Sequence, residues 1–331
     1  MFFPSLDEHN IKTVFILGDT FDRRKYVNFY SLQRTKKMFF DELQKRNIRV
    51  IMLVGNHDTY FKNTNEVNSV SLLLSEYNNI EMIYEPKTIE QDGVKVCMIP
   101  WICPENEQRS LAEISNTEAK ICMGHFEIGG FAMYRGAPSH EGLDRELFIP
   151  KFDMTFSGHY HHKSAGHHNN KYIHYLGNPY ELTWQDYADQ RGFHLFDLNT
   201  LELNFIPNPY TIFQKYFYND KELTMHNVMY DIDYDKFKNN YIKIVVVAKN
   251  NPYLFDLLVQ KVFEAGVIDI NIVEDFTDID TPEEDNDVDQ AEDTLTILEK
   301  YVGNLPTDLN KERLKNLFKE IYVEALNEES K

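Results

Sequence analysis

The chain has 331 residues, with 23 Phe and 20 Tyr, which is enough for a main domain with smaller additions and excludes a chain that is disordered throughout. Its formal charge of −19 argues against a strongly basic nucleic-acid binder. However, 11 of the acidic residues fall within residues 274–293, and the rest of the chain has 42 acidic and 34 basic residues, a net of −8, so DNA is not excluded as a partner.

The cysteines and the apolar runs indicate a cellular compartment. Cys97, Cys103 and Cys122 form no closely spaced pair of the kind that binds zinc or carries out redox chemistry. The sequence becomes charged at Asp7 and Glu8, and no apolar run is long enough to cross a bilayer. We therefore expect a cytoplasmic protein without a signal peptide or a membrane segment.

Two short apolar runs, at residues 13–17 and 50–54, each end at a glycine, a pattern typical of buried strands that close in a loop. Between them, the spacing of the apolar residues predicts a helix whose inner face carries Leu32, Met38, Phe39, Phe40 and Leu43. Strand, helix and strand in this order predict an α/β layered sheet.

The same pattern returns at residues 120–123, which lead into Gly124, and at residues 154–156, which lead toward Gly158. Four strands are therefore each followed by glycine and polar residues. Because ligands of open α/β sheets bind beyond the carboxyl ends of the strands, we expect these four loops to converge on one site.

Beyond Gly177, strands predicted at residues 192–196 and 201–206 are expected to complete the sheet, and Pro207 and Pro209 place a boundary near residue 210. A strand at 241–248, a helix at 253–264 and a strand at 268–273 form a small α+β module. The predicted organisation is a main domain at 1–210, the module at 211–275, an acidic linker at 276–293, and two amphipathic helices within 294–331, parted at 304–306.

The four loops hold the residues that carry chemistry: Gly18-Asp19-Thr20-Phe21-Asp22, Gly55-Asn56-His57-Asp58, Gly124-His125 and Gly158-His159-Tyr160-His161. Glycine lets backbone approach an ion closely, and a mixture of carboxylate, amide oxygen and imidazole suits divalent metals, with Mn²⁺ favoured over Mg²⁺. A carboxylate such as Asp19 can bridge two cations about 3.5–4 Å apart, the arrangement that hydrolyses phosphoesters.

In this order the loops resemble those of the calcineurin-like metallophosphoesterases. More narrowly, they resemble the Mre11/SbcD family of DNA-repair nucleases, including phage recombination endonuclease subunits. The resemblance continues along nearly the whole chain, at Ile99-Pro100-Trp101, Tyr175-Leu176-Gly177-Asn178-Pro179 and Arg191-Gly192-Phe193. It implies a layered β-sandwich flanked by helices, a small α+β capping module and C-terminal helices.

The resemblance also implies roles for individual residues. Asp19 would be the bridging ligand. Asn56, His125 and His159 would complete one metal site, and His161 would serve the other. His57 would act as an acid or charge stabiliser, Asp58 would orient its ring, and Asp22 would support the loop.

One family feature is missing, namely the strand ending in Asp-x-His that precedes the Gly-Asp loop. Asp7-Glu8-His9 has the right letters but lies too close to the first strand, and we interpret it as a helix end with Leu6 and Ile11 facing inward. The second metal is then left with Asp19 and His161, so we expect its site to be weakened. We also expect an N-terminally incomplete domain, with the missing strand encoded upstream of Met1.

The leading functional hypothesis is a Mn²⁺-dependent DNA exonuclease and endonuclease subunit that hydrolyses phosphodiester bonds in recombination and double-strand break repair. The resemblance implies a homodimer with an SMC-type ATPase like SbcC/Rad50, bound by the helices within 294–331 and, if phage-encoded, working in the host cytoplasm. Two alternatives stay open: a phosphatase or phosphodiesterase on non-DNA substrates, and an inactive docking subunit that lacks the first metal motif.

Further histidines and two tryptophans invite other interpretations. Five histidines lack the cysteine partners and regular spacing of a zinc site and are expected at the surface or facing substrate: His162, His167, His168, His174 and His194. Trp101 and Trp184 are expected to line the core or a pocket wall.

Overall fold

The computed structural model describes residues 1–134, 137–139, 142–274 and Lys311. The predicted acidic linker and, apart from Lys311, the predicted C-terminal helices lie outside the described residues. Among the described residues, no helix is both long enough and apolar enough to span a membrane.

Two β-sheets form the main body. The smaller is parallel and contains, in spatial order, β1 (Thr13–Leu17), β2 (Arg49–Leu53) and β3 (Ile80–Ile83). The larger has six strands in the order β10 (Ser164–His168), β11 (Lys171–Tyr175), β9 (Met154–Ser157), β6 (Ile121–Gly124), β5 (Val94–Ile99) and β4 (Lys87–Gln91). The predicted α/β class and the layered sandwich are confirmed. The strands that precede the four predicted ligand loops lie in two sheets, two in each, rather than in the single open sheet that the strand order alone suggested.

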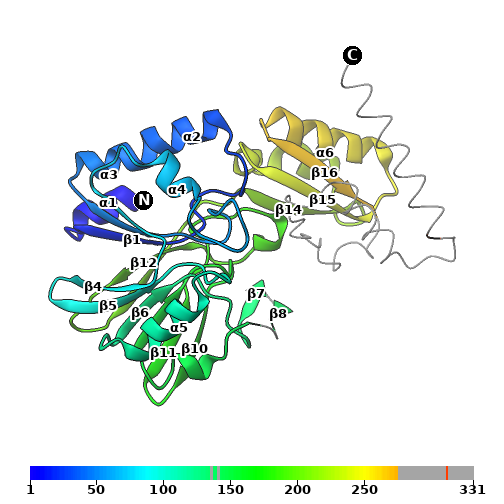
Figure 1. The fold of residues 1–331 in the computed structure, drawn as a ribbon. Coiled ribbons are helices and arrows are strands. Elements are labelled where there is room, and N and C mark those ends of the chain that lie inside the picture. The colour runs from blue at the N-terminus through cyan, green and yellow to red at the C-terminus, as the bar shows by residue number, and fades with distance from the viewer. Residues whose placement is uncertain (135–136, 140–141, 275–310, 312–331) are drawn as a thin grey trace.

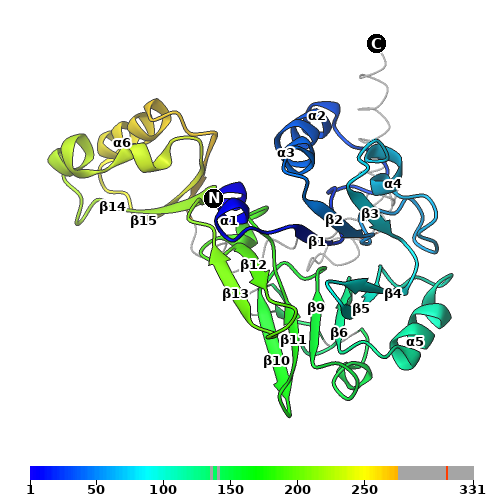
Figure 2. The same ribbon diagram turned by 90° about the vertical axis from the view of Figure 1, so that its left-hand side faces the viewer.

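The two sheets lie against each other, as Figure 2 shows, and residues of both form a shared apolar core between them. Alternate residues of a strand point to opposite faces. In β2, Ile51 and Leu53 therefore join the core between the sheets, while Val50 and Met52 face the helices on the other side. All four are fully buried, which explains why the sequence is unbroken apolar from residue 50 onward in this strand.

Short helices cover the outer face of the smaller sheet (Figure 1). They are α1 (Phe2–Glu8), α2 (Phe29–Thr35), a π-helical turn at Lys36–Phe40, α3 (Asp41–Lys45) and α4 (Ser69–Leu73). Phe40 and Leu43 are buried as expected, but Met38 is 55% exposed. Met38 was assigned wrongly to the inner face because three consecutive residues, 38–40, cannot share one face of a helix.

The Asp7-Glu8-His9 sequence lies at the end of the N-terminal helix. Helix α1 ends at Glu8, and His9 is its C-cap. Leu6 is buried, and Ile11 packs against the same apolar cluster. The interpretation of this stretch as a helix end is confirmed.

The larger sheet is covered on its other face by α5 (Glu107–Asn116) and by loops around a turn at Arg145–Leu147. A short hairpin of β7 (Ala132–Tyr134) and β8 (Ala137–Pro138) lies nearby. Strands β12 (Gly192–Phe196) and β13 (Leu203–Pro207) were expected to complete a main sheet. They pair only with each other instead, and contribute Phe196 and Leu203 to the edge of the core between the sheets.

A second, smaller unit follows. Its parallel sheet consists of β14 (Phe213–Asn219), β15 (Tyr241–Ala248) and β16 (Asp269–Val273), and α6 (Pro252–Glu264) packs on one face. Turns at Asn227–Asp231 and Tyr234–Phe237 join β14 to β15. The sequence predicted β15, α6 and β16 closely but missed β14. The boundary predicted near residue 210 falls between β13 and β14 and stays a prediction.

Candidate metal centre

The carboxyl ends of β1 and β2 in the smaller sheet meet those of β6 and β9 in the larger one. Asp19 follows β1 and His125 follows β6, and the carboxylate Oδ2 lies 3.1 Å from the ring Nε2. Asn56 follows β2, and its Oδ1 lies 2.9 Å from His125 Nε2 and 2.9 Å from His159 Nδ1. Four loops from two sheets therefore bring their polar side chains to one point.

Three glycines make this approach sterically feasible. A Cβ on Gly55 would lie 2.2 Å from Asp19 Oδ1, and one on Gly158 would lie 2.2 Å from the carbonyl oxygen of Leu17. A Cβ on Gly18 would lie 2.3 Å from His125 Nδ1. Any side chain at these positions would push the two sheet edges apart.

Two of the predicted ligands have backbone conformations that side-chain-bearing residues rarely adopt. Asp19 has φ 52° and His159 has φ 76°. Such residues each cost on the order of 1–3 kcal/mol and persist where the surrounding structure fixes them, commonly at functional sites. The strain lies at two of the four residues whose side chains converge on the centre.

The hydrogen bonds at His125 test whether the residues present fit a cation. Its Nδ1 lies 2.7 Å from the carbonyl oxygen of Leu17, so Nδ1 carries the proton and donates it. In the neutral ring, Nε2 then offers a lone pair, and it faces Asp19 Oδ2 and Asn56 Oδ1, which are also acceptors. Atoms that only accept converge here, and a metal-binding histidine characteristically donates its other nitrogen to a carbonyl. The residues therefore fit a divalent cation.

The ligand atoms are also close enough for one ion. The ligand atoms of Asp19, His125 and His159 all lie within 4.8 Å of one another. The predicted ligand His161 is not in this group, although Asp19 is among the charges that act on its pKa. The structure thus gathers Asp19, Asn56, His125 and His159 around one point and leaves His161 beside it.

Burial and charge set the protonation states at the centre. Burial raises the pKa of the Asp19 carboxyl, but positive charge at His125, together with His57, outweighs burial, so that the pKa lies well below its usual value. Burial lowers the pKa of His125, but Asp19 outweighs it in turn and raises the pKa, so the carboxylate favours a positive charge at Nε2, which a bound cation would supply in place of the proton. Burial, then the charge of His125, lowers the pKa of His159 to about 3. Asp19 is thus anionic and His159 neutral at pH 7, the forms that bind a metal.

Trp101 forms a wall of the centre. Its ring centre lies 5.2 Å from that of His159 and 6.0 Å from that of His125. Its backbone N–H donates to the carbonyl of Val54 at 2.8 Å, and so links the loop after β5 to the end of β2. Trp101 therefore packs against two of the predicted ligands, and its expected place in the core or a pocket wall stays a prediction.

Comparison with known proteins identifies the family. Residues 2–163 match the model of the calcineurin-like phosphoesterases. Over 323 residues the chain is 32% identical to exonuclease subunit 1 of Enterobacteria phage T4, covering 96% of this chain and 89% of the relative. The chain belongs to the calcineurin-like phosphoesterase family. The resemblance found in the sequence is confirmed at this level, and the chain carries the phosphoester-hydrolase domain of the family.

Solved structures show weaker similarity. An archaeal phosphodiesterase aligns with 62% of this chain and 88% of its own, at 15% identity and a TM-score of 0.33. Wild-type Vps29 of Entamoeba histolytica, solved with zinc, aligns with 58% of this chain and 88% of its own, at 14% identity and a TM-score of 0.27.

In this phosphoesterase, Asp58 does not play the part that the family resemblance implied. Its Oδ1 accepts from the backbone N–H of Thr20 at 3.0 Å and of Phe21 at 3.3 Å, and its Oδ2 accepts from Gly55 N–H at 2.9 Å. The His57 ring instead places Nδ1 2.8 Å from the carbonyl oxygen of Asp22. Asp58 is fully buried and ties the loop after β1 to the loop after β2, so it does not orient the ring of His57.

Asp22 also differs from its expected role. Its side chain is 90% exposed and pairs with Arg23 at 3.4 Å. Only its backbone carbonyl supports the site, through His57. His57 in turn donates its backbone N–H to Asp19 Oδ1 at 2.8 Å, so its ring and backbone both connect to the loop after β1.

A buried ionic network holds the loop of His161. The Arg191 guanidinium is 5% exposed and binds Asp186 Oδ1 at 2.6 Å and Asp189 Oδ2 at 2.9 Å. It also donates Nη1 to the carbonyl of His161, which accepts a second bond from Asn178 N–H at 3.1 Å. In the sequence, Arg191 was noted only as part of a motif shared with the resembled family. No feature of the sequence distinguished Asp186 and Asp189 from exposed acidic residues.

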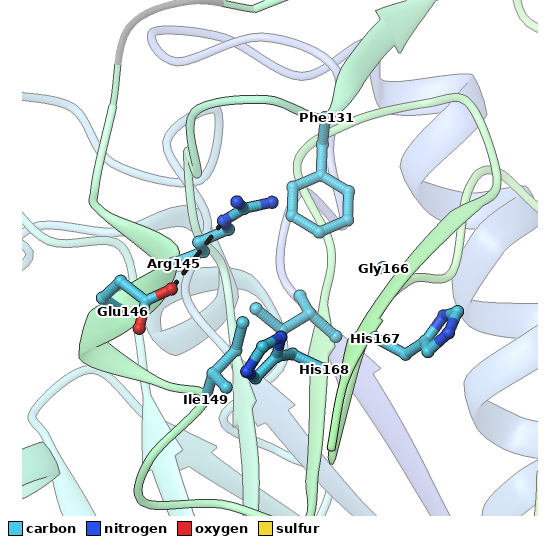
Figure 3. Close-up of a pocket in the computed structure, with 8 residues that line it drawn as sticks. Phe131, Arg145, Glu146, Ile149, Gly166, His167 and His168 are labelled. Atoms are coloured by element: carbon cyan, nitrogen blue, oxygen red, sulfur yellow. Dashed lines mark ion pairs between the residues drawn. The ribbon is translucent and has the colours of Figure 1, made fainter. Parts of the chain in front are cut away.

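A cavity of about 170 Å³ lies elsewhere, between the turn at Arg145–Leu147 and β10 (Figure 3). Its walls include Phe131, Ile149 and Ile173, with His168 and the 4.0 Å ion pair of Arg145 and Glu146 at the rim. None of its lining residues is a predicted metal ligand. The cavity is separate from the candidate metal centre.

Proposed function

We propose that this chain is the metal-dependent nuclease subunit of a DNA-processing complex, an exonuclease and endonuclease of the Mre11/SbcD type. The observation that carries the proposal is the convergence of Asp19, Asn56, His125 and His159 at the junction of two sheets. The relative from phage T4, named as an exonuclease subunit, supports DNA as the substrate.

The residues divide between two metal sites. Asp19, Asn56, His125 and His159 would hold one Mn²⁺ or Mg²⁺, and Asp19 and His161 would hold a second more weakly, because the described residues offer it fewer ligands. Bound divalent cations supply charge stabilisation at the phosphate and an activated water. Imidazole ligands favour Mn²⁺ over Mg²⁺ at these sites.

The remaining residues position substrate and protons. His57 is half-buried, and the Asp22 carbonyl holds its Nδ1, which leaves Nε2 to act on the phosphate or the leaving oxygen as an acid or charge stabiliser. Asp58 keeps the loops of Asp19 and Asn56 in register through its three backbone bonds. Trp101 shields the imidazole of His159 from water on one side.

The proposal extends to partners. A subunit of this type works in recombination and double-strand break repair as a homodimer with an SMC-type ATPase like SbcC/Rad50, in the host cytoplasm if it is phage-encoded. The segment expected to bind the ATPase, residues 294–331, lies outside the described residues except for Lys311.

The test compares substrates. The chain with its ATPase should hydrolyse duplex DNA ends in Mn²⁺ and lose this activity in EDTA, while His125→Asn should abolish it. Faster hydrolysis of a generic aryl phosphodiester than of DNA would favour the alternative of a non-DNA phosphodiesterase. Binding of the ATPase without hydrolysis of either substrate would identify an inactive docking subunit.

A further inference from the structure

Two loops beside the metal centre carry exposed aromatic rings together with basic side chains. The loop between β1 and α2 holds Arg23, Lys25 and Tyr26, and the loop between β2 and α4 holds Tyr60 and Phe61. The three rings are 55%, 43% and 47% exposed, respectively. We call these five residues the basic aromatic platform.

The two loops act as one surface. Arg23 Nη1 donates to the Tyr26 hydroxyl at 2.8 Å, and its Cζ lies 5.3 Å from the centre of that ring. Lys25 Nζ lies 5.9 Å from the centre of the Tyr60 ring, across from the other loop. Tyr60 and Phe61 pack edge to face at 4.7 Å. The platform therefore alternates cations and ring faces.

The platform adjoins the metal centre. The carbonyl that holds the His57 ring belongs to Asp22, next to Arg23. Tyr60 N–H donates to the carbonyl of Val67 at 2.9 Å, which closes the second loop at its base. Asn65 Nδ2 donates to the carbonyl of Trp101 at 2.8 Å, which fastens this loop to the wall of the centre. Both halves of the platform are fixed to residues of the centre.

The local charge is opposite to that of the whole protein. Residues 22–26 contain three basic residues and one acidic one, in a chain of net charge −19. A cationic surface on an acidic protein directs a polyanion to that surface and away from others. The position of this cationic surface beside the centre suits a DNA strand that leads to the scissile phosphate.

We infer that the basic aromatic platform binds unpaired nucleotides of the DNA substrate next to the scissile bond, an inference that rests on the proposed nuclease function. Exposed ring faces can stack only on bases that have left the duplex, because paired bases already stack on one another. The cations meanwhile neutralise the phosphates of the same strand. The platform thus requires a few unpaired nucleotides at the site of cleavage.

A protein surface is the competing occupant. On α2, Phe29 is 87% and Tyr30 is 68% exposed, and these apolar side chains continue from the end of the loop. A protein partner would use those rings and would gain little from the cations. The interleaved basic residues favour nucleic acid for the platform itself.

The experiment measures DNA binding by the full chain in EDTA, so that hydrolysis plays no part. The probes are a fluorescent oligothymidylate and a blunt duplex of equal length. Tyr60→Leu and Phe61→Leu should weaken binding of the single strand about tenfold each, with a smaller effect on the duplex. Tyr60→Phe keeps the ring face and should bind as the native chain does. Lys25→Ala should lower the slope of log affinity against log salt by about 0.7 on the single strand.

Matched controls lie away from the platform. Tyr253→Ala removes a tyrosine that is 68% exposed on α6, and Lys95→Ala removes a lysine that is 53% exposed on β5; both should bind the single strand normally. Equal losses on single strand and duplex, or no loss for Tyr60→Leu, would overturn the inference. A change of oligomeric state in Tyr60→Leu with unchanged DNA binding would assign the surface to a protein. A failure of the proposed nuclease function would give a different result from a failure of this inference. In that case the native chain would cleave no DNA in Mn²⁺, even if the platform variants still lost single-strand binding.

Discussion

Asp19 Oδ2 lies 3.1 Å from His125 Nε2, although the two residues follow strands of different sheets. No backbone hydrogen bond within one sheet fixes this distance. The core between the sheets fixes it, together with Gly18, Gly55 and Gly158, which let the strand ends approach. The candidate metal centre is therefore a product of sheet packing rather than of a single motif.

The first prediction concerns this pair. His125→Asn should weaken Mn²⁺ binding, measured by calorimetry, and should reduce hydrolysis at least ~100-fold, because the cation loses a ligand from the larger sheet. His174→Asn replaces a half-buried histidine of β11 outside the centre and is the control. Native Mn²⁺ affinity in His125→Asn would show that the metal lies elsewhere.

The second prediction separates Asp58 from its neighbour His57. Asp58→Asn should cost about 2–4 kcal/mol in free energy of unfolding, because the amide –NH₂ faces a backbone donor in place of an accepting oxygen. His57→Asn, at a half-exposed position, should cost under about 1 kcal/mol but lower kcat by roughly 10²–10⁴. Chemical denaturation in EDTA and steady-state kinetics provide the two measurements. If Asp58→Asn lowered kcat at unchanged stability, Asp58 would after all act through the His57 ring.

The third prediction concerns Arg191. Lysine has one nitrogen and cannot reach Asp186, Asp189 and the His161 carbonyl together, so Arg191→Lys should loosen the loop of His161. Hydrolysis should fall by about 10-fold to 100-fold while the tighter Mn²⁺ site is retained. Arg109→Lys, in an exposed ion pair with Glu85, should behave as the native chain does. If Arg191→Lys weakened both metal sites equally, Arg191 would stabilise the fold as a whole rather than the loop of His161 in particular.

Much of the centre was predictable because each of its parts has a local signal. An apolar run that ends at glycine and a polar residue identifies a strand end, and β1 agrees with its predicted bounds at both ends. The order of the four motifs then predicted the ligand types. Asp19, Asn56, His125 and His159 were all named from the sequence, and the structure brings them together.

What the sequence missed depends on contacts between distant residues. Whether strands share a sheet is decided by packing, so β12 and β13 were placed in a main sheet that they do not join. The partners of Asp58 are backbone amides up to 38 residues away. Almost every residue type has a backbone N–H, so the sequence does not indicate which residues donate to Asp58. From the sequence alone, Asp186 cannot be distinguished from an exposed acidic residue, because its buried ion pair with Arg191 is seen only in the structure.

The fourth prediction tests the close approach of the sheets. A methyl group at position 158 would lie 2.2 Å from the Leu17 carbonyl, which accepts the hydrogen bond of His125 Nδ1. Gly158→Ala should therefore weaken Mn²⁺ binding and cost about 1–3 kcal/mol in free energy of unfolding. Gly166→Ala, where the methyl group meets only the Phe131 ring at 3.0 Å, is the matched control and should retain Mn²⁺ affinity. Similar effects of both substitutions would contradict a special role for the glycine at 158.

The last prediction concerns stability in acid. Burial, followed by the charge of Lys163, lowers the pKa of His194 to about 4, from the usual value near 6.5. Between these two pH values the unfolded chain binds more protons than the folded one, so the free energy of unfolding decreases as the pH falls through this window. Above pH 6.5 the His194 ring is neutral in both the folded and the unfolded chain, so it no longer makes the free energy of unfolding depend on pH. In EDTA, His194→Gln should reduce the slope of unfolding free energy against pH by the equivalent of about one proton at most. His9→Gln, at the exposed end of α1, is the control, and an unchanged slope in His194→Gln would mean that the imidazole is solvated in the folded protein.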